Sequence, residues 1–221
     1  MKQYALGEVE TQTTLSSTRW TGQRMRLAGL AGMISGLGLL VQELPRFLDT
    51  SVESEGTFVF TGLHLGLALV LALAGVVVLG AHALYGDRYG RLGRASVYGL
   101  GAAFGLISVG IAAYALAPSA DPLAPVSDVG FFAMVLLTSA VGVLFWGKTD
   151  VNRVAAGLMG AVAPAFVLAI VLDEILGVVP ESLAFLIFLL PLALGLAALG
   201  HHLWMNTNGD GGVHVATPEG R

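Results

Sequence analysis

The stretch TFVFTGLHLGLALVLALAGVVVLGAHALY, residues 57–85, contains no Asp, Glu, Lys or Arg. An α-helix rises about 1.5 Å per residue, so this stretch is longer than the roughly 30 Å hydrocarbon core of a bilayer. The whole chain of 221 residues is 55% hydrophobic and 12% charged. Ordinary soluble domains carry about a quarter charged residues, so we predict an integral membrane protein.

Six apolar segments recur along the chain, and we predict that each crosses the membrane as a helix. Backbone polar groups in lipid must bond within the protein, which leaves helices and closed barrels, and no segment alternates as a barrel strand does. The predicted fold is therefore an all-α bundle of six transmembrane helices. They span about residues 25–48, 57–85, 95–116, 129–146, 154–179 and 182–204, in a membrane domain of residues 25–205 between polar tails 1–24 and 206–221.

Basic residues fall on alternate connections of this bundle. Arginines precede the first helix and fill the connection between the second and third, and Lys148 and Arg153 lie between the fourth and fifth. The other connections are mainly acidic, with Arg46 as the exception. Positively charged loops stay in the cytoplasm, so we predict that both termini are cytoplasmic. The richness in Ala, Val and Gly favours a prokaryotic cell membrane as the location.

Four ionisable residues are predicted to lie near the outer surface: Glu43, His64, Asp173 and Glu174. A charged residue at the bilayer centre costs about 2.5–3.5 kcal/mol, so those within spans usually have a partner or a role. We predict that the four converge on one outward-facing pocket that binds a solute or a proton, because a histidine titrates near neutral pH. The structural alternative is that the carboxylates lie in interfacial water and the histidine bonds to a backbone carbonyl.

Two further histidines, His82 and His201, each lie three residues before an aromatic residue at the cytoplasmic boundary. Neutral imidazoles on two helices can ligate a haem iron from both sides. The alternative function is therefore a b-type haem electron-transfer protein with these two axial ligands. His202 points about 100° away from His201 around its helix, so only one of the two faces this way. The structural alternative is a set of interfacial histidines packed beside the aromatic residues.

Several function classes are excluded or disfavoured. The chain has no cysteine, which excludes disulfides, thiolate metal sites and cysteine nucleophiles. It contains neither a Gly-x-Ser-x-Gly elbow nor a Walker-type loop, and no span holds a lysine for a Schiff base. A net charge of −4 gives no basic surface for nucleic acid. We predict a non-enzymatic protein, either transporter-like or a membrane subunit of a larger complex, with no cofactor except haem in the alternative.

Glycine pairs four residues apart predict close helix contacts. Such contacts occur either within the bundle or with other membrane subunits or a second copy of the chain. Proline within a helix removes a backbone donor and tends to kink it, so Pro164 and Pro191 predict kinks in the fifth and sixth helices. The glycine pairs are Gly32/Gly36, Gly62/Gly66 and Gly101/Gly105.

Overall fold

The computed structural model describes residues 22–48, 58–118 and 123–206, and all regular secondary structure in them is helical. Six of the described helical segments are long and apolar enough to cross a membrane. This confirms the predicted all-α fold. The elements are α1 (Gly22–Leu48), α2 (Phe58–Tyr85), α3 (Arg91–Leu116), α4 (Ala124–Lys148), α5 (Arg153–Gly160), α6 (Val162–Ile170), the π-helical turn η3 (Val171–Ile175) and α7 (Glu181–Asn206).

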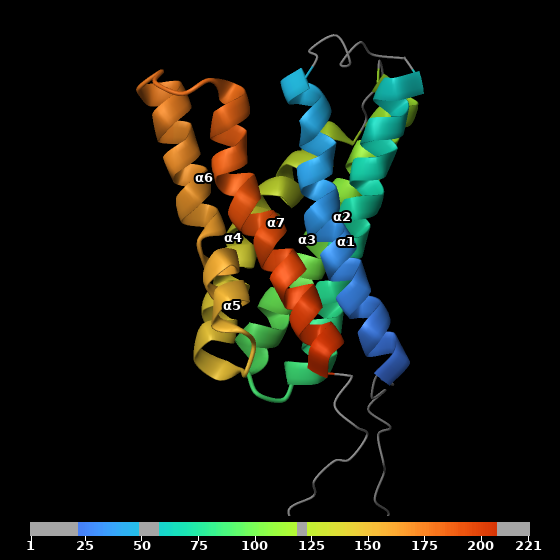
Figure 1. The fold of residues 1–221 in the computed structure, drawn as a ribbon, viewed down its shortest axis with the longest axis vertical. Helices are drawn as coiled ribbons and strands as arrows, with labels where there is room; N and C mark the ends of the chain where they lie inside the picture. The colour runs from blue at the N-terminus through green and yellow to red at the C-terminus, as the bar shows by residue number, and fades with distance from the viewer. Residues whose placement is uncertain (1–21, 49–57, 119–122, 207–221) are drawn as a thin grey trace, which may run out of the picture.

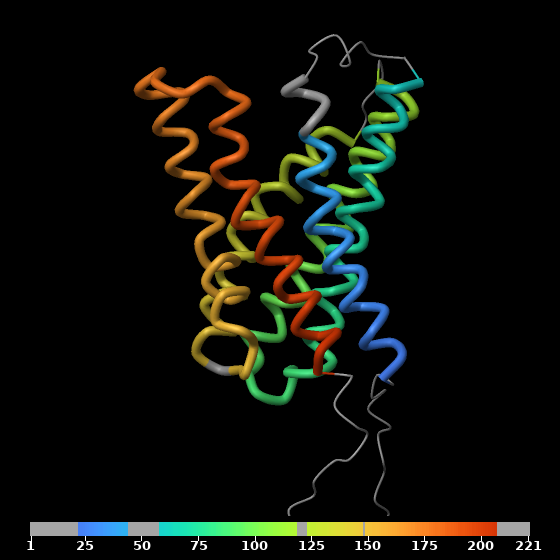
Figure 2. The backbone as a smooth tube through the Cα atoms, viewed as in Figure 1, coloured from blue at the N-terminus to red at the C-terminus, as the bar shows by residue number. Residues whose placement is uncertain are grey.

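The fifth span differs most from its prediction. It was expected as one helix over residues 154–179, whereas the structure divides Arg153–Ile175 into α5, α6 and η3. Figure 2 follows this course from the lower end of the bundle to its upper end. The predicted kink at Pro164 therefore coincides with a break in the helix. Pro191 lies inside α7 without dividing it.

The two ends of the bundle differ in charge. The start of α1, the end of α7 and the α2–α3 and α4–α5 connections share one end (Figure 1). This arginine-rich end carries Arg24, Arg26, Arg88, Arg91, Arg94 and Arg153. The opposite end, called the acidic end here, carries Asp173, Glu174 and Glu181, with Arg46 toward the end of α1.

A close helix contact joins α1 to α7 along small residues. A Cβ atom on Gly32 would lie 2.8 Å from the Cα atom of Gly200, and one on Gly36 would clash with the carbonyl oxygen of Ala193. The pair Gly32/Gly36 therefore packs against α7 within the bundle, as the first of the two expectations for it has it. A narrow α1–α7 contact fixes the crossing of the first and last helices.

The other two glycine pairs make looser contacts. A Cβ atom on Gly62 or Gly105 would meet nothing within 4 Å. Gly66 faces the side chain of Gln42, and Gly101 faces Leu79 at ordinary contact distance. These pairs do not bring two backbones together within the described bundle, so their role toward a partner stays a prediction.

Candidate functional site

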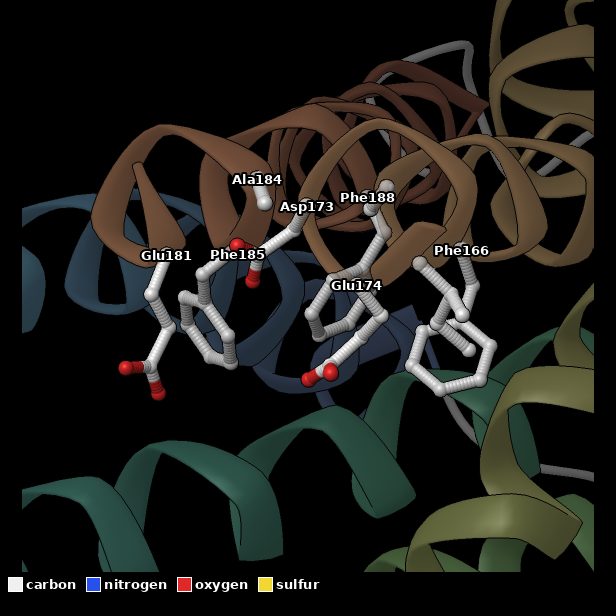
Figure 3. Close-up of a pocket in the computed structure, with 9 residues that line it drawn as sticks. Phe166, Asp173, Glu174, Glu181, Ala184, Phe185 and Phe188 are labelled. Atoms are coloured by element: carbon white, nitrogen blue, oxygen red, sulfur yellow. The ribbon is translucent and has the colours of Figure 1, made fainter. Parts of the chain in front are cut away.

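A cavity of about 160 Å³ lies at the acidic end, between the fifth span and the start of α7. It combines carboxylates with phenylalanine rings. Figure 3 shows the carboxylates of Glu174 and Glu181 on either side of the Phe185 ring, with Phe188 and Phe166 beyond. Its lining residues are Phe166, Ala169, Ile170, Asp173, Glu174, Glu181, Ala184, Phe185 and Phe188. We call it the carboxylate pocket.

The local backbone brings these carboxylates together. In η3 the N–H of Leu176 donates to the carbonyl of Val171 at 3.0 Å, an i→i−5 bond that widens the helix. The turn ends at Gly177, whose φ of 60° lies in the left-handed region that glycine adopts most easily. After this short connection α7 begins at Glu181. The sharp reversal places the acids of η3 opposite the first turn of α7.

Phenylalanine rings form the apolar side of the pocket. Phe166 of α6 and Phe188 of α7 pack edge to face with centroids 5.5 Å apart, and Phe131 of α4 completes a triangle with both. Phe185 lies 4.9 Å from Phe188 in the same geometry. Edge-to-face ring pairs of this kind are favourable, so the apolar wall joins α6, α7 and α4.

The pocket has the chemistry of a cation site without that of a metal site. Among its described lining residues three are acidic and none is basic. Within the described part of the chain, no three His, Asp or Glu side chains are grouped closely enough to hold a metal ion. Carboxylates attract cations in general, and aromatic faces attract organic cations such as alkylammonium groups.

The structure divides the four outer residues predicted to converge. Asp173 and Glu174 line the carboxylate pocket, whereas neither Glu43 nor His64 is among its described lining residues. The main contacts of η3 are with α6 and α7, whereas α1 packs on α7 and α2, and His64 lies on α2. The structure therefore brings two of the four predicted residues into this pocket.

His64 matches the structural alternative given for it. Its Nδ1 atom lies 2.9 Å from the carbonyl oxygen of Phe60, and its ring packs against those of Phe60 and Tyr114 at 4.1 and 5.5 Å. Glu43 is a buried carboxylic residue on α1, 6% exposed. The side chain of Arg46, three residues further along α1, lies outside the described residues. A role for Glu43 and His64 in binding a solute or proton stays a prediction.

The two histidines of the haem alternative face different surroundings. His82 lies 2.9 Å from the hydroxyl oxygen of Tyr89 through Nδ1, and its ring packs 4.5 Å from that of Tyr98 on α3. His201 is exposed on α7. The histidine of α7 that faces α2 is His202 instead. The pair His82 and His201 therefore does not fit a haem held between two axial imidazoles.

His202 belongs to a hydrogen-bonded network at the arginine-rich end. Its Nε2 atom lies 2.6 Å from the hydroxyl of Tyr85 and 2.9 Å from Nδ2 of Asn206. The guanidinium of Arg88 stacks over the Tyr85 ring at 5.4 Å and pairs with Asp150 of the α4–α5 connection. These contacts join α2, α7 and two connections, so the helices are tied together at this end.

Tyr89 adds a buried aromatic group to the same network. It is 3% exposed, and its ring packs 6.4 Å from that of Phe145 on α4. Burial raises the pKa of Tyr89 above its ordinary value of 10.0, because the charged phenolate loses its hydration. The hydrogen bond that the Arg88 guanidinium donates to Asp150 raises the pKa of Arg88. Both groups keep their protons at neutral pH, so the network is insensitive to pH changes near 7 at these two residues.

Two residues of these clusters were missed in the sequence. Glu181 was assigned to an outer connection, although the connection of residues 176–180 before it is too short for it to lie far from η3. His202 and its neighbour His201 are adjacent in sequence, and nothing in the sequence says which of them faces α2.

The chain matches no family model, no curated protein and no solved structure in comparisons with known proteins.

Proposed function

We propose that this is a non-enzymatic, transporter-like membrane protein that binds an organic cation in the carboxylate pocket, which faces the outside of the cell. The observation that supports it is the grouping of Asp173, Glu174 and Glu181 with phenylalanine rings and no described basic lining residue. The positive-inside rule supports the orientation, because Arg88, Arg91 and Arg94 lie at the opposite end of the bundle.

Electrostatics and ring chemistry together favour an alkylammonium ion over a metal cation. Two opposite unit charges 4 Å apart attract by about 4 kcal/mol at an effective dielectric constant near 20. A cation over an aromatic face gains about 0.5–2 kcal/mol more. A strongly hydrated metal ion needs several close oxygen ligands to replace its water, whereas an alkylammonium ion is weakly hydrated and contacts both walls. The pocket therefore repels anions and prefers organic cations.

The proposal is tested with choline and its uncharged isostere 3,3-dimethylbutan-1-ol as probes. We expect the full-length protein in lipid nanodiscs to bind choline at least tenfold more tightly than the isostere, because only choline carries the charge. Isothermal titration calorimetry measures both. Equal affinities, or no choline binding at millimolar concentration, would contradict the proposal. Uptake of choline into proteoliposomes then separates a transporter from a solute-binding subunit, since only a transporter moves the probe without partners.

A further inference from the structure

The fifth span is broken by a side chain from a neighbouring helix. In a regular helix the N–H of Ala163 would donate to the carbonyl of Met159. Here it donates to Oγ of Ser139 on α4 at 2.7 Å, and the Ser139 hydroxyl donates to the carbonyl of Met159 at 3.4 Å. The Ser139 hydroxyl thus takes the place of the direct hydrogen bond between these two backbone groups. Pro164 has no N–H, so the next helical hydrogen bond, to the carbonyl of Gly160, is also missing.

The break separates the α5 half of the span from the half that ends at the pocket acids. On the α5 side, a Cβ atom on Gly142 of α4 would clash with the backbone of Gly160, and one on Gly195 of α7 would lie 3.0 Å from Met159. Beyond the break, the helix resumes where the N–H of Ala165 donates to the carbonyl of Ala161 at 2.9 Å. The α5 half is therefore wedged between α4 and α7.

The half beyond the break carries the pocket acids and contacts α4 and α7 through Phe166. Val162–Ile170 and η3 present apolar side chains outward, among them Val167 at 59% and Ile175 at 69% exposure. Asp173 and Glu174 lie at its far end, so a small change of angle at the break moves them by the largest amount. The rest of the pocket lies on α7, which is continuous.

We propose that residues 160–163 are a hinge, latched by Ser139, about which Val162–Ile175 moves relative to α7 to set the width of the carboxylate pocket. Without the hydroxyl, the Ala163 N–H and the Met159 carbonyl either bond each other directly or lose their partner. An unpaired backbone group is strongly disfavoured inside a membrane. If these two groups bond each other directly, the turns on either side of the break come closer together. The direction of α6 and η3 relative to α7 then changes. The functional meaning of this movement rests on the proposed cation site, but the movement itself is measured without a ligand.

The test uses spin labels on the full-length protein in nanodiscs, which the absence of native cysteine makes possible. The reporting pair is Phe58→Cys with Ile175→Cys, and the reference pair is Phe58→Cys with Leu116→Cys, all at exposed positions. Electron–electron double resonance measures both distances. We expect Ser139→Ala to shift the mean reporting distance by about 3 Å or more and to leave the reference distance unchanged.

The matched control is Ser108→Ala. The Ser108 hydroxyl also donates to a carbonyl on a neighbouring helix, that of Ala68 at 2.7 Å, but no helix is broken there. We expect it to change neither distance. In a second variant, Pro164→Ala, residue 164 gains an N–H that can donate to the carbonyl of Gly160. We expect this variant to shift the reporting distance while the Ser139 hydroxyl is still present.

Two results would overturn the hinge: an unchanged reporting distance in both Ser139→Ala and Pro164→Ala, or a change of the reporting and reference distances together. The choline titration of the wild-type protein decides the cation site separately. A shifted distance without choline binding would leave the hinge standing and remove the proposed function. Choline binding without a distance shift in either variant would remove the hinge and leave the proposed function standing.

Discussion

The double variant Asp173→Asn, Glu174→Gln is expected to bind choline at least about 100-fold more weakly than the wild-type protein. Two of the three carboxylates that line the pocket would then be uncharged, while the size of both side chains stays nearly the same. A 100-fold loss corresponds to about 2.7 kcal/mol, which lies within the attraction that two partly exposed charges supply at short range. Calorimetric titration in nanodiscs measures the change.

The matched control removes two carboxylates at the other end of the bundle. Asp87 and Asp150 are exposed, and they pair with Arg94 of α3 and Arg88 of the α2–α3 connection. We expect Asp87→Asn, Asp150→Asn to bind choline as the wild type does, although its net charge changes by the same amount. A similar loss in both double variants would show that choline responds to overall charge, and retained binding in the first would remove the carboxylate pocket as its site.

Gly36→Leu is expected to lower the free energy of unfolding by about 3 kcal/mol or more, or to prevent folding. Even the first carbon of the new side chain would meet the carbonyl oxygen of Ala193 on α7. Backbone atoms cannot rotate away as a side chain can, and overpacking a tight contact typically costs about 1–3 kcal/mol or more. Thermal unfolding in detergent, followed by circular dichroism, gives the difference.

Gly105→Leu is the control for this substitution. A Cβ atom on Gly105 meets nothing within 4 Å, and leucine favours the helix over glycine by up to about 1 kcal/mol. We expect the stability of this variant to stay within about 1 kcal/mol of the wild type. Equal stability of the Gly36 and Gly105 variants would contradict the α1–α7 contact described above.

The membrane fold could be predicted from the sequence because backbone polar groups in lipid must bond within the protein, which leaves few possible folds. Residues 57–85 contain no charged residue, and the structure places α2 at Phe58–Tyr85. Helix ends were less accurate, since α4 begins at Ala124 and continues through the polar Ser127 and Asp128 before the apolar run starts. Apolar composition marks where a helix crosses lipid, while the helix itself extends into the interface.

The candidate site was predicted only in part. Counting residues along a helix gives the depth of a side chain, which correctly put Asp173 and Glu174 at one end of the fifth span. Depth does not tell which helices are neighbours, so it could not show that Glu43 is not among the described residues that line the same pocket. The break at Pro164 was indicated by the proline, but the Ser139 hydroxyl that fills it comes from another helix, and no local pattern marks such a contact.

The central claim is that the carboxylate pocket faces outward and the arginine-rich connections face the cytoplasm. Single cysteines at Val178 and Asp87, both exposed, mark the two ends. Intact cells that express either variant are treated with a membrane-impermeant maleimide, and lysed cells serve as the reference. The account predicts that Val178→Cys is labelled in intact cells and Asp87→Cys only after lysis. Labelling of Asp87→Cys in intact cells, with Val178→Cys protected, would contradict it.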